Sequence, residues 1–167
     1  MEKAVFVING TGGVGKDTVC EMAAALCPVR SVSSITPIVE IARSAGWDGV
    51  KTPASRRLLS RLKDVFTEYN DLPFRYCMQQ VEEFLAGSER LMFLHVREPR
   101  EIERLRQAVG PCCHTLLVRR PGVSGQLLGN PSDDGVEGYQ YDAVIENDGG
   151  LDELRQKVAD FVAAFLA

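Results

Sequence analysis

Residues that bind metals are scarce in this sequence. It contains 2 histidines among 167 residues, and its 5 cysteines include no Cys-x-x-Cys pair. A structural zinc site needs four such ligands at short spacings, so we do not expect one. Scattered cysteines in an odd number also fit no disulfide framework. We therefore expect free thiols in a reducing cytoplasm, with Cys20 and Cys27 packed as small hydrophobic side chains.

Long apolar runs and an excess of positive charge are absent as well. No stretch approaches the roughly 18 apolar residues of a membrane span, and the start Met-Glu-Lys lacks the pattern of a signal peptide. The net charge of -4 argues against a nucleic acid polymer as partner, because binding to its phosphates depends on clusters of Lys and Arg. We expect a cytoplasmic protein without membrane or nucleic acid partners. A small phosphorylated substrate would need only a local basic pocket.

What the chain does contain is a glycine-rich loop between an apolar run and a lysine, in residues 4–18, AVFVINGTGGVGKDT. Glycines let the backbone wrap around a phosphate so that its amides converge on the anion. The lysine can reach the outer phosphates, and the N-terminus of the following helix favours negative charge. The stretch therefore predicts a P-loop. Its predicted nucleotide-binding residues are Gly10, Thr11, Gly12, Gly13, Val14, Gly15, Lys16, Asp17 and Thr18.

The hydroxyl expected to bind magnesium comes one residue later than in the general motif. Asp17 follows Lys16 directly, and Thr18 supplies the hydroxyl, so we predict Thr18 as the metal ligand. This shift resembles nucleoside monophosphate kinases such as adenylate kinases. The Gly-Lys-Asp-Thr form is similar to deoxynucleoside monophosphate kinases of the phage and bacterial type. ATP and Mg²⁺ are the cofactors that this resemblance implies.

Strands and helices alternate along the whole chain. Apolar runs predict strands at 4–9, 29–33, 90–96, 114–118 and 143–145. Helical spacing and capping residues predict helices at 18–26, 36–45, 52–69, 74–86, 99–108 and from 151 onward. The alternation predicts one domain, 1–167, with a three-layer α/β/α P-loop NTPase fold around a five-stranded parallel sheet. The helical residues expected to face inward include Leu58, Val65, Tyr69, Leu85 and Leu151.

Ligands of such sheets bind at the carboxyl ends of the strands. Residues just beyond the predicted strand ends should therefore share one rim of the molecule. They are residues 9–16, Ser33, Ser34, residues 95–97, Arg119, Arg120 and Asn147.

Two further segments resemble the same kinases. In FLHVREPREIERLR, residues 93–106, Val96, Arg97, Pro99 and Glu101 match the strand end of deoxynucleoside monophosphate kinases. His95 stands where that family has an aspartate.

The second segment, YDAVIENDGGLDELRQKV, is similar to those kinases and to dephospho-coenzyme A kinases. In these families an Asn-Asp-Gly or Asn-Asn-Gly turn lies near the adenine. Asn147 and Gly149 fit that turn, so the resemblance implies Asn147 as a nucleotide contact.

The middle of the chain is similar to the acceptor side of the family. KTPASRRLLSRLKD, residues 51–64, matches in placement the helix that binds the monophosphate. The resemblance implies a helical acceptor-binding region at 46–88 and a short lid-like loop at 119–140. The residues implied to bind the acceptor are Ser34, Arg56, Arg57, Lys63 and Asp64.

The activity implied by the resemblance is transfer of the γ-phosphoryl group of ATP to a nucleoside or deoxynucleoside monophosphate, or to a similar small phosphorylated acceptor. This chemistry depends on positioning and on positive charge around a negative transition state. The implied catalytic residues are Lys16, Arg97, Arg119 and Arg120.

Several of these residues also have a purely structural interpretation. Arg56, Arg57 and Arg61 fit the solvated side of a helix, and Arg97 fits an ion pair with Glu101. The sequence does not separate these interpretations. It is equally compatible with a homodimer.

His95 keeps a second function open. A hydrogen-bonded, buried histidine is the default interpretation, with a metal or base role as the alternative. Neutral imidazole is a poor substitute for the aspartate that holds magnesium. The alternative function is thus a regulatory protein that binds nucleotide with weak or no kinase activity. A GTPase switch is disfavoured because no Asn-Lys-x-Asp motif occurs.

Overall fold

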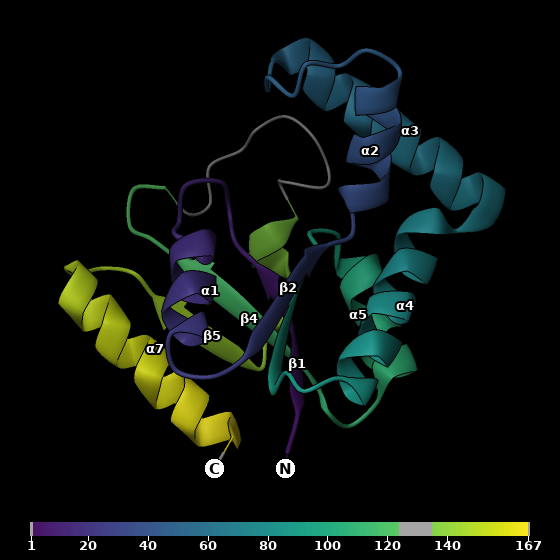
Figure 1. Cartoon of the computed structure of the whole chain (residues 1–167). Helices are drawn as coiled ribbons and strands as arrows, with labels where there is room; N and C mark the ends of the chain where they lie inside the picture. Colours follow the sequence, from purple (N-terminus) through teal and green to yellow (C-terminus); the bar gives the residue numbers. More distant parts are fainter. Residues whose placement is uncertain (1, 124–134, 167) are drawn as a thin grey trace.

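The computed structural model of the chain describes residues 2–123 and 135–166. Its centre is a sheet of five strands in the order β2-β3-β1-β4-β5, and all of the pairings are parallel. Figure 1 shows the strands with helices around them. The strands are β1 (Ala4–Asn9), β2 (Val29–Ser33), β3 (Leu91–His95), β4 (Cys113–Arg119) and β5 (Ala143–Glu146). The predicted five-stranded parallel sheet is confirmed.

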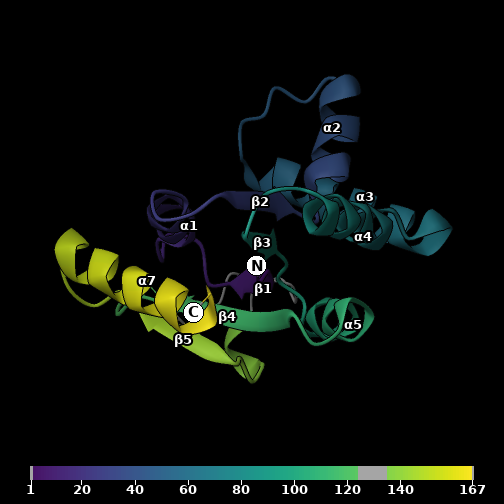
Figure 2. The ribbon, with the colours of Figure 1, turned by 60° about the horizontal axis from the view of Figure 1, so that its bottom comes forward.

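Side chains along the central strand alternate between two hydrophobic clusters. Phe6 and Ile8 pack with α1 (Lys16–Ala24) and α7 (Leu151–Leu166). Val5 and Val7 pack with α4 (Leu72–Ala86) and α5 (Pro99–Val109). Figure 2 shows these two pairs of helices on opposite sides of the sheet. The three-layer arrangement is therefore confirmed as well.

A third cluster lies outside the sheet layers, between α2 (Thr36–Ser44) and α3 (Pro53–Asn70), and is formed by Ile38, Ala42 and Leu59. These two helices stand beyond the carboxyl edge of the sheet (Figure 1). At the start of α3, Ser55 N donates to Thr52 Oγ1 at 3.1 Å and Thr52 N donates to Ser55 Oγ at 2.8 Å. This capping box explains why the helix begins after Thr52.

Five helical residues that were predicted to face inward are exposed, and those predictions are wrong. The exposed fractions are 42% for Leu58, 57% for Val65, 80% for Tyr69, 47% for Leu85 and 65% for Leu151. Helical spacing tells which residues share a side of a helix, but it does not tell how much of that side another element covers.

The segment before β5 is only partly described. A short 3₁₀ turn, η1, spans Val136–Gly138, and residues 124–134 of the predicted lid-like loop lie outside the described residues. No helix in the described ranges combines the length and the apolar character that crossing a bilayer requires.

Candidate functional site

The glycine-rich loop leaves the sheet at its topological switch point. It follows β1, which lies between β3 and β4, and it leads directly into α1. In an open parallel sheet the crevice at such a point is where ligands bind. The fold therefore places residues 10–15 where an anion would meet the first turn of a helix.

Glycine is required at Gly10 by close contacts. A Cβ on this residue would lie 2.6 Å from the carbonyl oxygen of Val118 and 2.7 Å from Cγ2 of Val14. Gly13 and Gly15 have φ angles of 88° and 100°, which side-chain-bearing residues rarely adopt. The loop is thus a backbone cradle with no room for side chains at its base, as a phosphate site needs.

Asn9 fixes the start of this cradle. Its side chain is fully buried, and its Oδ1 accepts a hydrogen bond of 2.9 Å from Gly10 N. Its Nδ2 donates to the carbonyl oxygen of Arg97 at 2.9 Å and to the hydroxyl of Tyr141 at 3.0 Å. Asn9 thereby ties the loop to the end of β3. The sequence signal for this role was a polar residue ending an otherwise apolar strand.

Lys16 begins α1 and reaches back across the loop. Its Nζ donates to the carbonyl oxygen of Gly10 at 2.6 Å, and its side chain is half-buried. Asp17 and Thr18 follow in the first helical turn, with Asp17 exposed and Thr18 half-buried. The ammonium group is therefore held against the start of the loop, and Thr18, predicted to bind magnesium, lies two residues further along the same helix.

Asn147 supports the loop from the end of β5. Its Nδ2 donates to the carbonyl oxygen of Val14 at 2.9 Å, and its backbone N–H donates to that of Arg119 at 2.7 Å. A Cβ on Gly15 would lie 2.9 Å from the same Nδ2. Asn147 is thus a structural contact of the P-loop, and its predicted place beside the adenine stays a prediction.

Two of the predicted catalytic arginines lie at the end of β4. Arg119 forms ion pairs with Glu137, Nε to Oε2 at 3.3 Å, and with Glu146, Nη1 to Oε1 at 3.6 Å. Arg120 is exposed, and its Nη1 donates to the carbonyl oxygen of Gly13 at 3.4 Å. Arg120 therefore borders the cradle directly, whereas Arg119 is engaged with carboxylates.

Arg97 lies at the same edge, two residues beyond the end of β3. It is exposed, and its charge acts on His95. The structure thus brings Lys16, Arg97 and Arg120 to one edge of the sheet. This arrangement supplies positive charge around the cradle.

His95 is a half-buried, hydrogen-bonded side chain. Its Nε2 lies 3.0 Å from Ser31 Oγ and 3.7 Å from Cys20 Sγ. Burial lowers the pKa of the imidazole, and the charge of Lys16 lowers it further. The ring is therefore neutral at pH 7, which agrees with the default interpretation of this residue.

Because the folded protein lowers the pKa of His95, protonation favours the unfolded chain. The neutral ring of His95 contributes its full stabilisation to the folded protein above the ordinary pKa of 6.5. This stabilisation is lost as the pH falls through the lower pKa of the folded state. In the variant His95→Gln, the glutamine amide keeps a nitrogen near the position of Nε2, but this side chain does not titrate. We expect the stability of wild type relative to this variant to decline between about pH 7 and pH 5 in urea unfolding. A difference that does not vary with pH would contradict a lowered pKa.

Magnesium would have few protein ligands here. In the described ranges no group of three or more His, Cys, Asp and Glu side chains is arranged to hold a metal ion. Mg²⁺ in nucleotide sites is bound mostly by phosphates and water, with one or two protein oxygens. Thr18 fits that limited role, and Asp17 is the nearest carboxylate in sequence.

Lys63, predicted to contact the acceptor, is engaged within the chain. Its Nζ lies 3.1 Å from Glu98 Oε1 and 2.9 Å from Glu101 Oε2, and its side chain is only 11% exposed. Burial lowers the pKa of Lys63, but the two carboxylates outweigh this effect and raise it. The partner of Glu101 is thus Lys63. The cluster fastens α3 to the β3–α5 connection that carries Arg97.

Removing this ammonium group should loosen α3. Lys63→Met keeps the aliphatic stem but leaves Glu98 and Glu101 without their shared cation. We expect the free energy of unfolding to fall by about 1–3 kcal/mol, measured by urea denaturation. The matched control is Lys157→Met, because Lys157 pairs with Asp148 on the surface and should leave stability nearly unchanged. Equal effects of the two variants would contradict the anchoring role of Lys63.

The remaining predicted acceptor residues come from the end of β2 and from α3. Ser34 is buried, and its N–H donates to the carbonyl oxygen of His95 at 3.2 Å. Arg56, Arg57 and Asp64 are exposed on α3. Arg56 lies two helical turns before Lys63, so both share the side of α3 that faces the β3–α5 connection.

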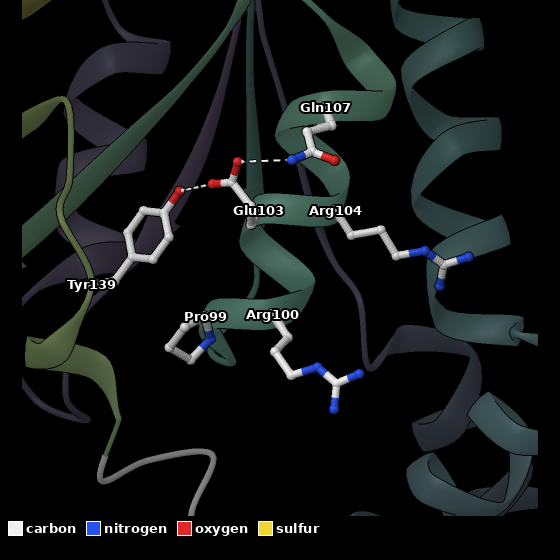
Figure 3. Close-up of a pocket in the computed structure, with 6 residues that line it drawn as sticks. All are labelled: Pro99, Arg100, Glu103, Arg104, Gln107 and Tyr139. Carbon is white, nitrogen blue, oxygen red and sulfur yellow. Dashed lines mark hydrogen bonds between the residues drawn. The ribbon is translucent and has the colours of Figure 1, made fainter.

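A separate groove of about 440 Å³ follows α5, and its lining residues include none of the P-loop. Figure 3 shows Tyr139 and Gln107 directed toward Glu103, at 2.7 and 3.1 Å. Arg104 binds both carboxylate oxygens of Asp71, at 2.7 and 2.5 Å. The charged groups of the groove are therefore largely paired, and we place the candidate site at the P-loop.

Comparison with known proteins bears on the fold. No protein-family model and no curated protein matches the sequence. Among solved structures, the chain is similar to TT1252 from Thermus thermophilus, with 20% identity over 100% of both chains and a TM-score of 0.59. It is similar to the tunicamycin resistance protein of Deinococcus radiodurans, with 15% identity over 96% of each chain and a TM-score of 0.58. A dephospho-CoA kinase from Campylobacter jejuni has 15% identity over 98% of this chain and 97% of its own, with a TM-score of 0.55. The predicted P-loop kinase fold is confirmed.

Proposed function

We propose that this chain, which has the fold of P-loop kinases, is an ATP-dependent phosphotransferase. The observation that carries the proposal is the cradle of residues 10–15, closed at its base by contacts of Gly10 and open toward Lys16. Such a cradle favours phosphates, and the cations at its edge favour the charge that develops during phosphoryl transfer.

The residues divide into a nucleotide side and an acceptor side. The loop amides and Lys16 would hold the outer phosphates of ATP, and Thr18 would contribute a ligand to Mg²⁺. Bound ATP would supply the phosphoryl group. Arg120 borders the loop, and Arg97 lies at the same edge of the sheet, where it would neutralise charge on the transferred group.

For the acceptor we propose a nucleoside or deoxynucleoside monophosphate, or a similar small phosphorylated molecule. The support is that Arg97 follows the end of β3 and that Arg56 is exposed on α3, the helix that Lys63 fastens to the β3–α5 connection. A phosphate of the acceptor would bind between such cations, because each can donate paired hydrogen bonds to it. The localisation that we propose is cytoplasmic.

The test is an assay of ADP release with ATP, Mg²⁺ and a panel of nucleoside, deoxynucleoside and non-nucleoside monophosphates. We expect turnover with one class of acceptor and none without acceptor. Release of ADP at the same rate without any acceptor would instead indicate an ATPase and would contradict the proposal.

A second candidate function is a regulatory protein that binds nucleotide. It is favoured by His95, whose neutral ring points to Ser31 and Cys20 and offers no carboxylate at the end of β3. The same panel separates the two functions. Tight binding of ATP in calorimetry with no turnover on any acceptor would support regulation.

A further inference from the structure

The outer side of α3 carries an apolar stripe that the described part of the chain covers only at Leu62. Leu58, Leu62, Val65 and Tyr69 follow one another at spacings of four, three and four residues. Leu58, Val65 and Tyr69 are 42%, 57% and 80% exposed. This spacing is that of the seam of a two-stranded coiled coil. Figure 1 shows α3 at the periphery of the molecule, away from the sheet.

The stripe leads into a hollow between α2 and α3. Its volume is about 540 Å³, and we call it the α2–α3 hollow. Leu58 and Leu62 belong to both the stripe and the hollow, so the two form one continuous surface. The hollow is also lined by Ile41, Ala45, Trp47 and Ala54.

Charges beside the stripe change sign along the helix. Arg61 lies beside its first half, and Glu68 lies one residue before Tyr69 in its second half. Both are exposed, and in the described part of the chain neither takes part in an ion pair. One half of the stripe is therefore flanked by positive charge and the other half by negative charge. Two such stripes in antiparallel orientation would bring opposite charges next to each other.

We propose that α3 is the contact by which two copies of this chain form a two-fold symmetric dimer. Antiparallel pairing about the middle of the stripe sets Leu58 opposite Tyr69 of the second copy and Leu62 opposite its Val65. Arg61 of each copy then meets Glu68 of the other, so the symmetric contact forms both ion pairs at once. The pairing also brings the ring of each Tyr69 to the rim of the partner's α2–α3 hollow.

A second copy of this chain, as the partner of α3, accounts for features that a different partner would leave unexplained. A tyrosine that is 80% exposed, an apolar hollow and a charge reversal along one helix are all used by the same symmetric contact. The Lys63 side of α3 faces Glu98 and Glu101 instead. The contact therefore leaves the edge of the sheet that carries the P-loop open, and it does not depend on the proposed activity.

The first test is sedimentation velocity over a series of protein concentrations. A single helix pair with one hollow on each copy is a small interface, so we expect the wild-type dimer to form at protein concentrations up to about 100 µM. Val65→Glu should raise the dissociation constant at least about 100-fold, because each dimer would bury two carboxylates at its centre. The control is Leu151→Glu, which changes an equally exposed apolar residue on α7 and should leave the dimer intact.

Charge reversal tests the orientation of the helices and does not depend on buried residues. Arg61→Glu and Glu68→Arg should each raise the dissociation constant about 10-fold, and the double variant should restore it to nearly the wild-type value. The sequence has a single tryptophan, Trp47, which lines the hollow. Its fluorescence should therefore change when the dimer forms. A wild-type protein that stays monomeric at 100 µM, or a dimer unaffected by Val65→Glu and both reversals, would overturn the proposal.

Discussion

Lys16→Met is expected to lower the rate of phosphoryl transfer from ATP by about 10³-fold, which corresponds to about 4 kcal/mol of transition-state stabilisation. The ammonium group is the cation held nearest the base of the cradle, 2.6 Å from the carbonyl oxygen of Gly10. In phosphoryl transfer, catalysis consists almost entirely of positioning and charge stabilisation. Methionine retains the length and the apolar stem of the side chain, so the change removes the charge with little change of packing.

The measurement is the turnover number for ADP release with the best acceptor of the panel, together with ATP binding in calorimetry. Weaker ATP binding with an equally reduced turnover would indicate that Lys16 acts in both the bound and the transition state. Lys157→Met serves as the control, since this lysine lies on α7 and pairs with Asp148. A Lys16→Met protein that is folded and retains wild-type turnover would exclude phosphoryl transfer at this loop.

The layers of the fold and its parallel sheet follow from local patterns that the sequence carries directly. Apolar strands alternate with helices, and the glycines that need unusual φ angles occur together in a single loop. These features act over short distances, so they are readable without knowledge of the packing. The position of Lys16, Arg97, Arg119 and Arg120 at one edge of the sheet follows from the same rule, because parallel strands end together.

Contacts between distant segments could not be predicted from these patterns. The sequence predicts Lys63 as a contact of the acceptor, but its partners are Glu98 in the β3–α5 connection and Glu101 in the first turn of α5. Tyr69 continues an apolar spacing, yet it is 80% exposed among the residues that the structure describes. Periodicity describes one helix at a time, whereas pairing and burial depend on how two elements meet.

Asn9 illustrates a third limit. As the last residue of an apolar strand it was assigned only to the rim of the sheet. In the structure it connects the P-loop, the Arg97 carbonyl and Tyr141 through one buried amide. The role of such an asparagine is recognised only when the positions of its partners in the fold are known. Gly10 is its neighbour in the sequence, but Arg97 and Tyr141 are each more than 80 residues away from it.

Gly10→Ala is expected to lower the free energy of unfolding by about 2–4 kcal/mol and to abolish ATP binding. The added Cβ would lie 2.6 Å from the carbonyl oxygen of Val118, which is backbone and cannot rotate away. Neither strand can shift easily, because β1 and β4 pair in the middle of the sheet with Asn9 opposite Leu117. The clash must therefore be relieved by moving the loop, which also moves its amides out of the cradle.

Gly12→Ala provides the matched control in the same loop. A Cβ on Gly12 would meet no heavy atom within 4 Å, and its φ is not positive, so we expect a change in stability of less than about 1 kcal/mol. Urea unfolding with and without ATP measures both properties. At an ATP concentration of 100 times its dissociation constant, Gly12→Ala should gain about 2.7 kcal/mol if it still binds, and Gly10→Ala should gain nothing. Equal behaviour of the two variants would mean that the loop is not held by the contact between Gly10 and Val118, since the two substitutions add the same atom and differ in what surrounds it.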